Sequence, residues 1–165
     1  MAAFEELWSY EVGKAGWATL KFSTPEEELV CAVSYLHDSL GDLAAMALAL
    51  AKGAHRAAAV FMDEPGEVHL SMEGGHDTLS YELRQYADWA SWGITAMDDY
   101  EVLARGQVAR EDVVRSVYRV LDGIYCGMGV EEYRKRWLEH EFPLRDYQSL
   151  GSAIRKRDLS RLMRG

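Results

Sequence analysis

The chain has 165 residues, of which 48% are hydrophobic and 27% are charged. This composition fits one globular domain and excludes a disordered chain. The formal net charge of −9 is unevenly divided, because residues 1–100 carry 17 acidic and 5 basic side chains, whereas residues 101–165 carry 10 acidic and 13 basic ones. The acidic part would repel phosphate groups and attract a basic protein, so we expect a protein partner and no nucleic acid.

The N-terminus and the cysteines indicate a cytoplasmic protein. The first ten residues contain acidic and no basic side chains, unlike a secretory signal, and the longest apolar stretch, residues 43–51, is about half a membrane span. Cys31 and Cys126 lack the spacing of a disulfide framework or a metal site, and we expect both to be buried thiols. We therefore predict a cytoplasmic location without membrane contact.

The first half of the chain alternates between strand patterns and one helix. Period-two patterns predict strands over residues 7–12 and 16–22, and residues 29–36 are apolar on both faces, which is typical of a central strand. Asp38 is a good N-cap for a helix that ends at Gly53. Its expected buried stripe comprises Leu40, Leu43, Ala44, Ala47, Leu50 and Ala51.

A meander of strands is predicted next. Residues 56–62 form a second strand that is apolar on both faces, and Asp63-Glu64-Pro65-Gly66 predicts a turn. Residues 67–73 and 78–84 alternate around a hairpin turn at Gly74-Gly75, with Glu67 and His69 expected to point outward. Residues 86–100 have no steady period and are interpreted as a loop, followed by a short strand over 100–103 that ends before Gly106.

The last third of the chain is helical. Helical periodicity predicts helices over residues 109–125, 130–139 and 143 to about 154. Residues 155–165, with five basic side chains and one acidic one, are interpreted as a basic C-terminal tail after a single domain over residues 1–154. The expected class is α+β, with an antiparallel sheet of about six strands, one helix between strands 3 and 4, and the C-terminal helices packed on one face.

The sequence contains no recognisable catalytic motif. Neither a glycine-rich phosphate loop nor a nucleophile elbow nor a zinc-binding HExxH motif occurs. His37-Asp38 and His76-Asp77 are each isolated pairs, so we expect no metal and no cofactor. The alternative is a small enzyme or ligand-binding domain with a pocket between sheet and helices, using His69, Glu82 and Arg84 as polar groups.

Candidate partner-binding residues fall in the turn at residues 63–66 and in the loop over residues 86–100. Large aromatic side chains flanked by charge are typical of protein interfaces. Whether the two tryptophans lie on the surface or fold back into the core stays open at this point. The candidates are Asp63, Glu64, Asp88, Trp89, Trp92, Asp98 and Asp99.

A resemblance adds a more specific hypothesis. The segment YLHDSLGDLAAMALALAKG, a strand that leads into DEPG, and helices containing EEYRKRW and EFP resemble small bacterial proteins, some of which are immunity proteins for polymorphic toxins. The resemblance spans residues 29–150 and implies a non-enzymatic protein that neutralises a cognate toxin by occluding a basic surface. It implies no particular site residue. A homo-oligomeric accessory protein, for example a homodimer, is the remaining alternative.

Overall fold

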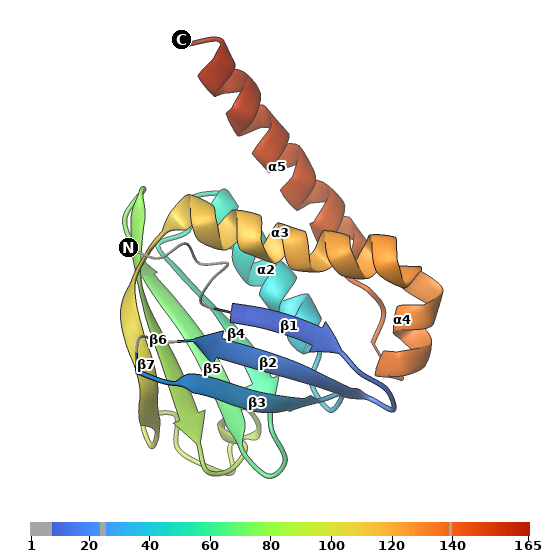
Figure 1. Cartoon of the computed structure of the whole chain (residues 1–165). Coiled ribbons are helices and arrows are strands. Elements are labelled where there is room, and N and C mark those ends of the chain that lie inside the picture. The colour runs from blue at the N-terminus through green and yellow to red at the C-terminus, as the bar shows by residue number, and fades with distance from the viewer. Residues whose placement is uncertain (1–7, 24–25, 139) are drawn as a thin grey trace.

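The computed structural model describes residues 8–23, 26–138 and 140–165. Residues 7 and 139, the ends of two predicted elements, lie outside the described residues. Within these residues, seven antiparallel strands form two sheets, one α-helix connects the third strand to the fourth, and the remaining α-helices follow the last strand (Figure 1). The predicted α+β class is therefore confirmed, with two sheets in place of one.

The first sheet has the strand order β1-β2-β3 and consists of β1 (Trp8–Val12), β2 (Trp17–Ser23) and β3 (Glu28–Ser34). The prediction that residues 29–36 form a central strand is wrong, because β3 lies at the edge of this sheet. Only one of its faces is covered: Val33 is buried, whereas Val30 is 61% exposed. The apolar outward residues of β3 therefore do not indicate a second packed layer.

The second sheet has the strand order β4-β5-β6-β7 and consists of β4 (Arg56–Met62), β5 (Glu67–Gly74), β6 (Thr78–Tyr86) and β7 (Glu101–Ala109). Strand β7 is longer than predicted because Gly106 lies within it, opposite Tyr81. A Cβ atom at Gly106 would lie 2.7 Å from the Tyr81 hydroxyl oxygen. The glycine thus makes room for the aromatic ring and does not end the strand.

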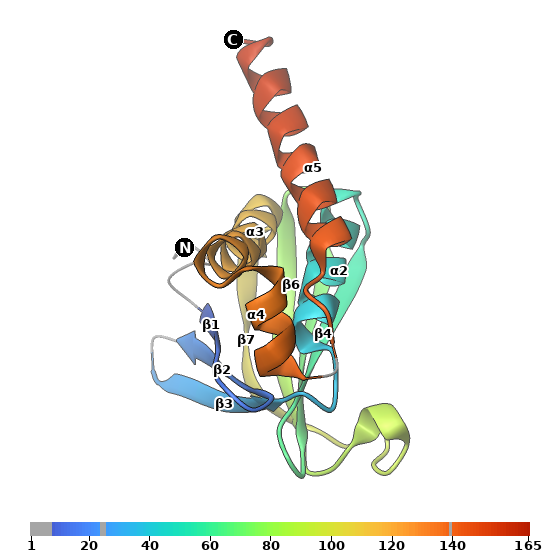
Figure 2. The same ribbon diagram turned by 90° about the vertical axis from the view of Figure 1, so that its right-hand side faces the viewer.

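The helices are α2 (Ser39–Ala51), α3 (Arg110–Gly127), α4 (Gly129–Trp137) and α5 (Leu144–Leu162). Helix α2 begins as predicted, because the Asp38 carboxylate accepts the backbone N–H of Gly41 at 3.0 Å. Helix α5 continues well beyond residue 154, and its C-terminal part extends past the rest of the molecule (Figure 2). No helix among the described residues is long and apolar enough to cross a membrane.

The core lies between the two sheets and continues into the helices. The rings of Phe22 and Tyr81 lie 5.5 Å apart and join the sheets, as do those of Tyr10 and Phe61 at 6.3 Å. Helix α2 packs against β4 and also contacts α3 and α5. The same side of the four-stranded sheet therefore carries both the three-stranded sheet and the helices.

The two cysteines differ in exposure. Cys31 is half-buried in β3, whereas Cys126 is exposed. The prediction that Cys126 is buried is wrong, because this residue lies off the apolar stripe of α3 that includes Leu121 and Ile124. Neither cysteine forms a disulfide.

Candidate protein-binding site

Two predicted segments meet at one end of the four-stranded sheet. The turn over residues 63–66 follows β4, and the loop over residues 87–100 follows β6; β4 and β6 run in the same direction, because both are antiparallel to β5. A Cβ atom at Gly66 would lie 2.5 Å from the carbonyl oxygen of Tyr86, so the backbones of the two segments touch. We call residues 63–66 and 87–100 the strand-end site; it lies at the lower edge of the sheet in Figure 1.

The loop is anchored by a buried carboxylate. Glu67 is 0% exposed, and its Oε1 accepts the backbone N–H of Ser91 at 2.8 Å. Its Oε2 accepts the Ser91 hydroxyl at 2.6 Å and lies 2.6 Å from Nε2 of His69. The prediction that Glu67 and His69 point into solvent is wrong, because the loop folds over these outward positions.

The pKa of Glu67 is set by two opposing effects. Burial raises the pKa, because a charged carboxylate loses hydration, whereas the hydrogen bonds from Ser91 and His69 stabilise the ionised form. The hydrogen bonds outweigh burial, so the pKa of Glu67 lies below its ordinary value. The anchor is therefore ionised at neutral pH.

Aromatic contacts fix the second half of the loop. The buried ring of Tyr86 lies 4.5 Å from the His69 ring and 5.6 Å from the Tyr100 ring. Its hydroxyl donates a hydrogen bond to the carbonyl oxygen of Met97 at 2.8 Å. The Arg84 guanidinium lies 4.6 Å from the centre of the Tyr100 ring, a cation–π distance. The loop is thus held in its middle and near its end.

The two tryptophan rings contact each other edge to face on the surface. Their ring centres lie 4.6 Å apart at an interplanar angle of 61°. Trp89 is half-buried, and its indole N–H is buried without a hydrogen-bond partner among the described residues, whereas Trp92 is 52% exposed. Trp92 lies in a short 3-10 helix, η1 (Ala90–Trp92), which ends at Gly93. Trp89 therefore supports Trp92, and Trp92 presents its ring to solvent.

The acidic candidate residues differ in exposure and in the hydrogen bonds that their carboxylates accept. Asp98 and Asp99 are exposed. Asp88 is half-buried, and its Oδ1 accepts the backbone N–H of Trp89 at 2.8 Å. In the turn, Glu64 is exposed but accepts the Ser34 hydroxyl at 2.6 Å, and Asp63 is half-buried.

Burial and the neighbouring Glu64 raise the pKa of Asp63. The strand-end site contains five carboxylates and no Lys or Arg. All seven predicted residues thus lie at one end of the sheet, and those that present free surface are Trp92, Asp98 and Asp99.

Sequence reasoning missed two exposed apolar side chains in the same loop. Ile94 is 58% exposed and Met97 is 57% exposed. Their position beside Trp92 in a segment without a steady period is the available signal, because loops run over the surface. The role of Glu67 and Ser91 had no sequence signal, since their contact depends on how the loop folds back.

The residues of the alternative enzyme hypothesis do not converge. His69 is paired with Glu67, whereas Glu82 pairs with Arg84 at 2.6 Å and with Arg105 at 3.6 Å. His69 and Glu82 therefore have different partners. Within the described parts of the chain, no three His, Cys, Asp or Glu side chains gather in a way that could hold a metal ion.

Comparison with known proteins adds no relative. No protein family, curated protein or solved structure matches this chain.

Proposed function

We propose that this protein is a non-enzymatic binding protein that docks a basic partner protein on the strand-end site. The observation that carries the proposal is the exposure of Trp92, Ile94 and Met97, each above one half, on a loop fixed by the buried Glu67. Large apolar side chains in a charged rim are the usual energetic centre of a protein interface.

Preorganisation supports the proposal. A loop that is already fixed loses little conformational entropy when a partner binds, so more of the contact energy becomes affinity. The contacts of Ser91 with Glu67 and of Tyr86 with Met97 hold the loop on either side of Trp92. The Trp89 ring supports the Trp92 ring, which remains 52% exposed. The apolar side chains are thus presented in a defined arrangement.

The charge of the site indicates the chemistry of the partner. Asp98 and Asp99 are exposed beside the apolar side chains, and no basic residue lies within the strand-end site. A basic partner would be attracted before contact, which accelerates association at low salt. A partner surface with Lys and Arg around an apolar hollow fits this arrangement.

The resemblance to toxin-immunity proteins suggests which basic partner this is. In this proposal the protein neutralises a cognate bacterial toxin, and the strand-end site covers the toxin's basic catalytic cleft. Trp92 would fill the centre of the interface, while Asp98 and Asp99 would steer approach. The mechanism is occlusion, so it requires no chemistry from this chain.

The experiment pairs the protein with the toxin-like product of the gene beside its own. Survival of bacterial cells that express both, and the dissociation constant of the purified pair, are measured for the natural chain and for Trp92→Ala. We expect the substitution to weaken binding by about 2 kcal/mol, or about 30-fold, and to reduce protection.

Trp17→Ala is the matched control, because Trp17 is 40% exposed and lies in β2, near the turn that contacts α4. This control should bind as the natural chain does. Equal loss in both variants, or a natural chain that neither binds nor protects, would contradict the proposal.

A further inference from the structure

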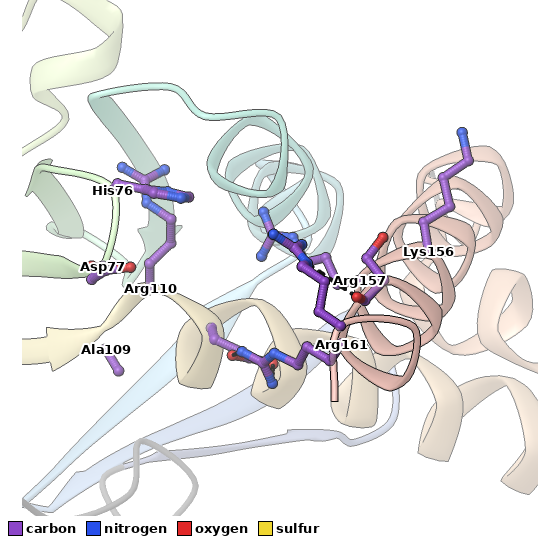
Figure 3. Close-up of a pocket in the computed structure, with 10 residues that line it drawn as sticks. His76, Asp77, Ala109, Arg110, Lys156, Arg157 and Arg161 are labelled. Carbon is purple, nitrogen blue, oxygen red and sulfur yellow. Dashed lines mark hydrogen bonds and ion pairs between the residues drawn. The ribbon is translucent and has the colours of Figure 1, made fainter.

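A hollow lies at the opposite end of the molecule from the strand-end site. Its volume is about 490 Å³, and it lies between the β5–β6 hairpin, the start of α3 and the C-terminal part of α5 (Figure 3). Among the described residues, the lining contains five Lys and Arg side chains but two carboxylates, those of Asp77 and Glu111. This concentration of positive charge occurs in a protein whose formal net charge is −9.

One of these cations is fully enclosed. Arg110 is 3% exposed, and its guanidinium donates hydrogen bonds to the carbonyl oxygens of Leu50 and Ala54, both at 2.8 Å, and of Gly75 at 3.1 Å. No carboxylate among the described residues hydrogen-bonds to this guanidinium. The carbonyl dipoles stabilise the cation but do not neutralise its charge. Arg110 therefore contributes positive potential to the hollow.

Two cations on α5, Arg157 and Arg161, are also held by hydrogen bonds. Arg157 donates to the carbonyl oxygen of Ala51 at 2.6 Å, and Figure 3 shows Arg157 and Arg161 extending from α5 toward the other elements of the hollow. The Glu111 carboxylate pairs with Arg115 and accepts hydrogen bonds from both Nη atoms of Arg161. Each of these Nη atoms keeps a second N–H group. The two lining carboxylates therefore leave most of the positive charge uncompensated.

The remaining lining selects against an apolar ligand. Among the described lining residues, Ala109 is the only aliphatic side chain, Ser160 supplies a neutral hydroxyl, and no Phe, Tyr or Trp occurs. Arginine forks bind planar or tetrahedral oxyanions through paired N–H donors, and phosphate groups suit them best. A hollow of this size accommodates a small molecule.

We propose that this hollow binds a small anion that carries phosphate groups. Arg161 and Arg164 supply N–H donors from α5, while the buried Arg110 and the half-buried Arg157 supply fixed positive potential. The site is independent of the strand-end site, because the two lie at opposite ends of the molecule (Figures 1 and 2).

Isothermal titration calorimetry with inorganic pyrophosphate tests the proposal at low salt. We expect saturable binding of one pyrophosphate per chain. The double variant Arg161→Gln/Arg164→Gln should weaken this binding about tenfold or more, because it removes two charge-assisted contacts. Both side chains are exposed, so the variant should remain folded, and circular dichroism checks this.

The double variant Arg134→Gln/Arg145→Gln is the matched control. It removes the same charge from two exposed arginines outside the hollow, and Arg134 also pairs with one carboxylate, that of Glu141 at 3.8 Å. This control should bind pyrophosphate within about twofold of the natural chain, as is usual for distant surface charges. Equal weakening in both double variants would mean non-specific attraction and would overturn the proposal.

Two further measurements distinguish a small phosphate-bearing anion from other anionic ligands. Binding of a single-stranded oligonucleotide in the absence of pyrophosphate binding would overturn the proposal in favour of a nucleic acid. Self-association that is lost in Arg161→Gln/Arg164→Gln, again without pyrophosphate binding, would overturn it in favour of the acidic end of a second copy. The oligonucleotide outcome does not bear on the strand-end site, whose test uses a different ligand and different residues. Self-association through the acidic end would instead place a second copy on the strand-end site.

Discussion

Glu67 shows how one buried side chain can determine the shape of a recognition loop. Replacing it by glutamine removes the negative charge and places an amide N–H₂ beside donors of Ser91 and His69. We expect Glu67→Gln to lower the free energy of unfolding by about 2 kcal/mol, because a buried hydrogen bond to a charged group is lost and its partners are left unsatisfied. Chemical denaturation gives this value, and limited proteolysis reports opening of residues 87–100.

Glu73→Gln is the control for that substitution. Glu73 lies on the same strand and the same face, but it is exposed and pairs only with the exposed Arg56 at 2.9 Å. Such a pair contributes little, so Glu73→Gln should change stability by less than about 0.5 kcal/mol. Equal effects at the two positions would show that burial under the loop is not what makes Glu67 important.

The same carboxylate predicts an acid-sensitive loop. The pKa of Glu67 is lower in the folded protein than its ordinary value of about 4.3, because hydrogen bonds from Ser91 and His69 outweigh burial. Its contribution to stability is therefore complete above about pH 4.3 and is lost as the pH falls through the folded pKa. Tryptophan fluorescence from Trp89 and Trp92 should change in this acid range, and Glu67→Gln should remove that part of the change.

The cysteines give a prediction of chemical reactivity. Burial, and secondarily the charge of Asp63, raise the pKa of the Cys31 thiol to about 12, so almost no thiolate is present near pH 8. Cys126 is exposed. Iodoacetamide should therefore modify Cys126 alone in the native protein, and both cysteines after denaturation. Mass spectrometry counts the adducts, and rapid native modification of Cys31 would contradict the described packing of β3.

At the scale of elements, the open edge of β4 is capped by helix α2. The Asp42 carboxylate accepts the backbone N–H of Val60 at 3.1 Å and also contacts the His37 imidazole at 2.7 Å. Asp42→Ala leaves this edge N–H without its acceptor. We expect a loss of about 1.5 kcal/mol in the free energy of unfolding, measured by urea denaturation.

Asp112→Ala is a suitable control for Asp42→Ala. Both aspartates lie in the first turn of a helix, so both lose a similar favourable interaction with the helix dipole. The difference between the two variants therefore reports the contacts of Asp42 with Val60 and His37. Asp42→Asn, which keeps one acceptor oxygen, should recover part of the loss, and no recovery would argue against the cap.

Local sequence patterns predicted which helices and strands form better than they predicted which strands pair with each other. The helix from Asp38 and the hairpin around Gly74-Gly75 follow from capping and alternation, and both occur in the structure. The split into two sheets was not predictable, because residues 29–36 and 56–62 have similar apolar patterns although both are edge strands. Alternation shows which face of a strand is apolar, but not which strand pairs with which.

The candidate site was predicted only in part, because sequence patterns do not show which distant segments pack together. Composition alone located the loop with Trp92, Asp98 and Asp99, because aromatic and acidic residues without a period are typical of an exposed loop. Its anchor at Glu67 was missed, because alternation assigns that residue to the outer face and says nothing about what covers it. The basic hollow was missed because Arg110 and α5 are 34 or more positions apart in the sequence.

The whole molecule carries its charges at separate ends. The strand-end site has five carboxylates, whereas the hollow beside α5 gathers five Lys and Arg side chains (Figures 2 and 3). A protein with this distribution has a directional electrostatic field, which orients charged partners as they approach. Salt should therefore slow association at either end without changing the contacts made after binding.

The two ends should also be separable by truncation. A chain that stops after Arg155 lacks the Arg157 contact with the Ala51 carbonyl, the Asp158 pair with Arg115 at 2.5 Å, and the Arg161 pair with Glu111. Because the Arg157 contact is half-buried and caps α2, we expect a loss of about 2 kcal/mol, which lowers the melting temperature by about 5 °C.

The fluorescence of Trp92 and binding at the strand-end site should be unchanged in the truncated chain, because both belong to the other end of the four-stranded sheet. Scanning calorimetry measures the first effect and a binding titration the second. A truncated chain as stable as the natural one would mean that residues 155–165 behave as the solvated tail that their composition predicts. Loss of binding together with stability would mean that the two ends fold and act as one unit, because α2 would then transmit the disturbance through β4 to the loop.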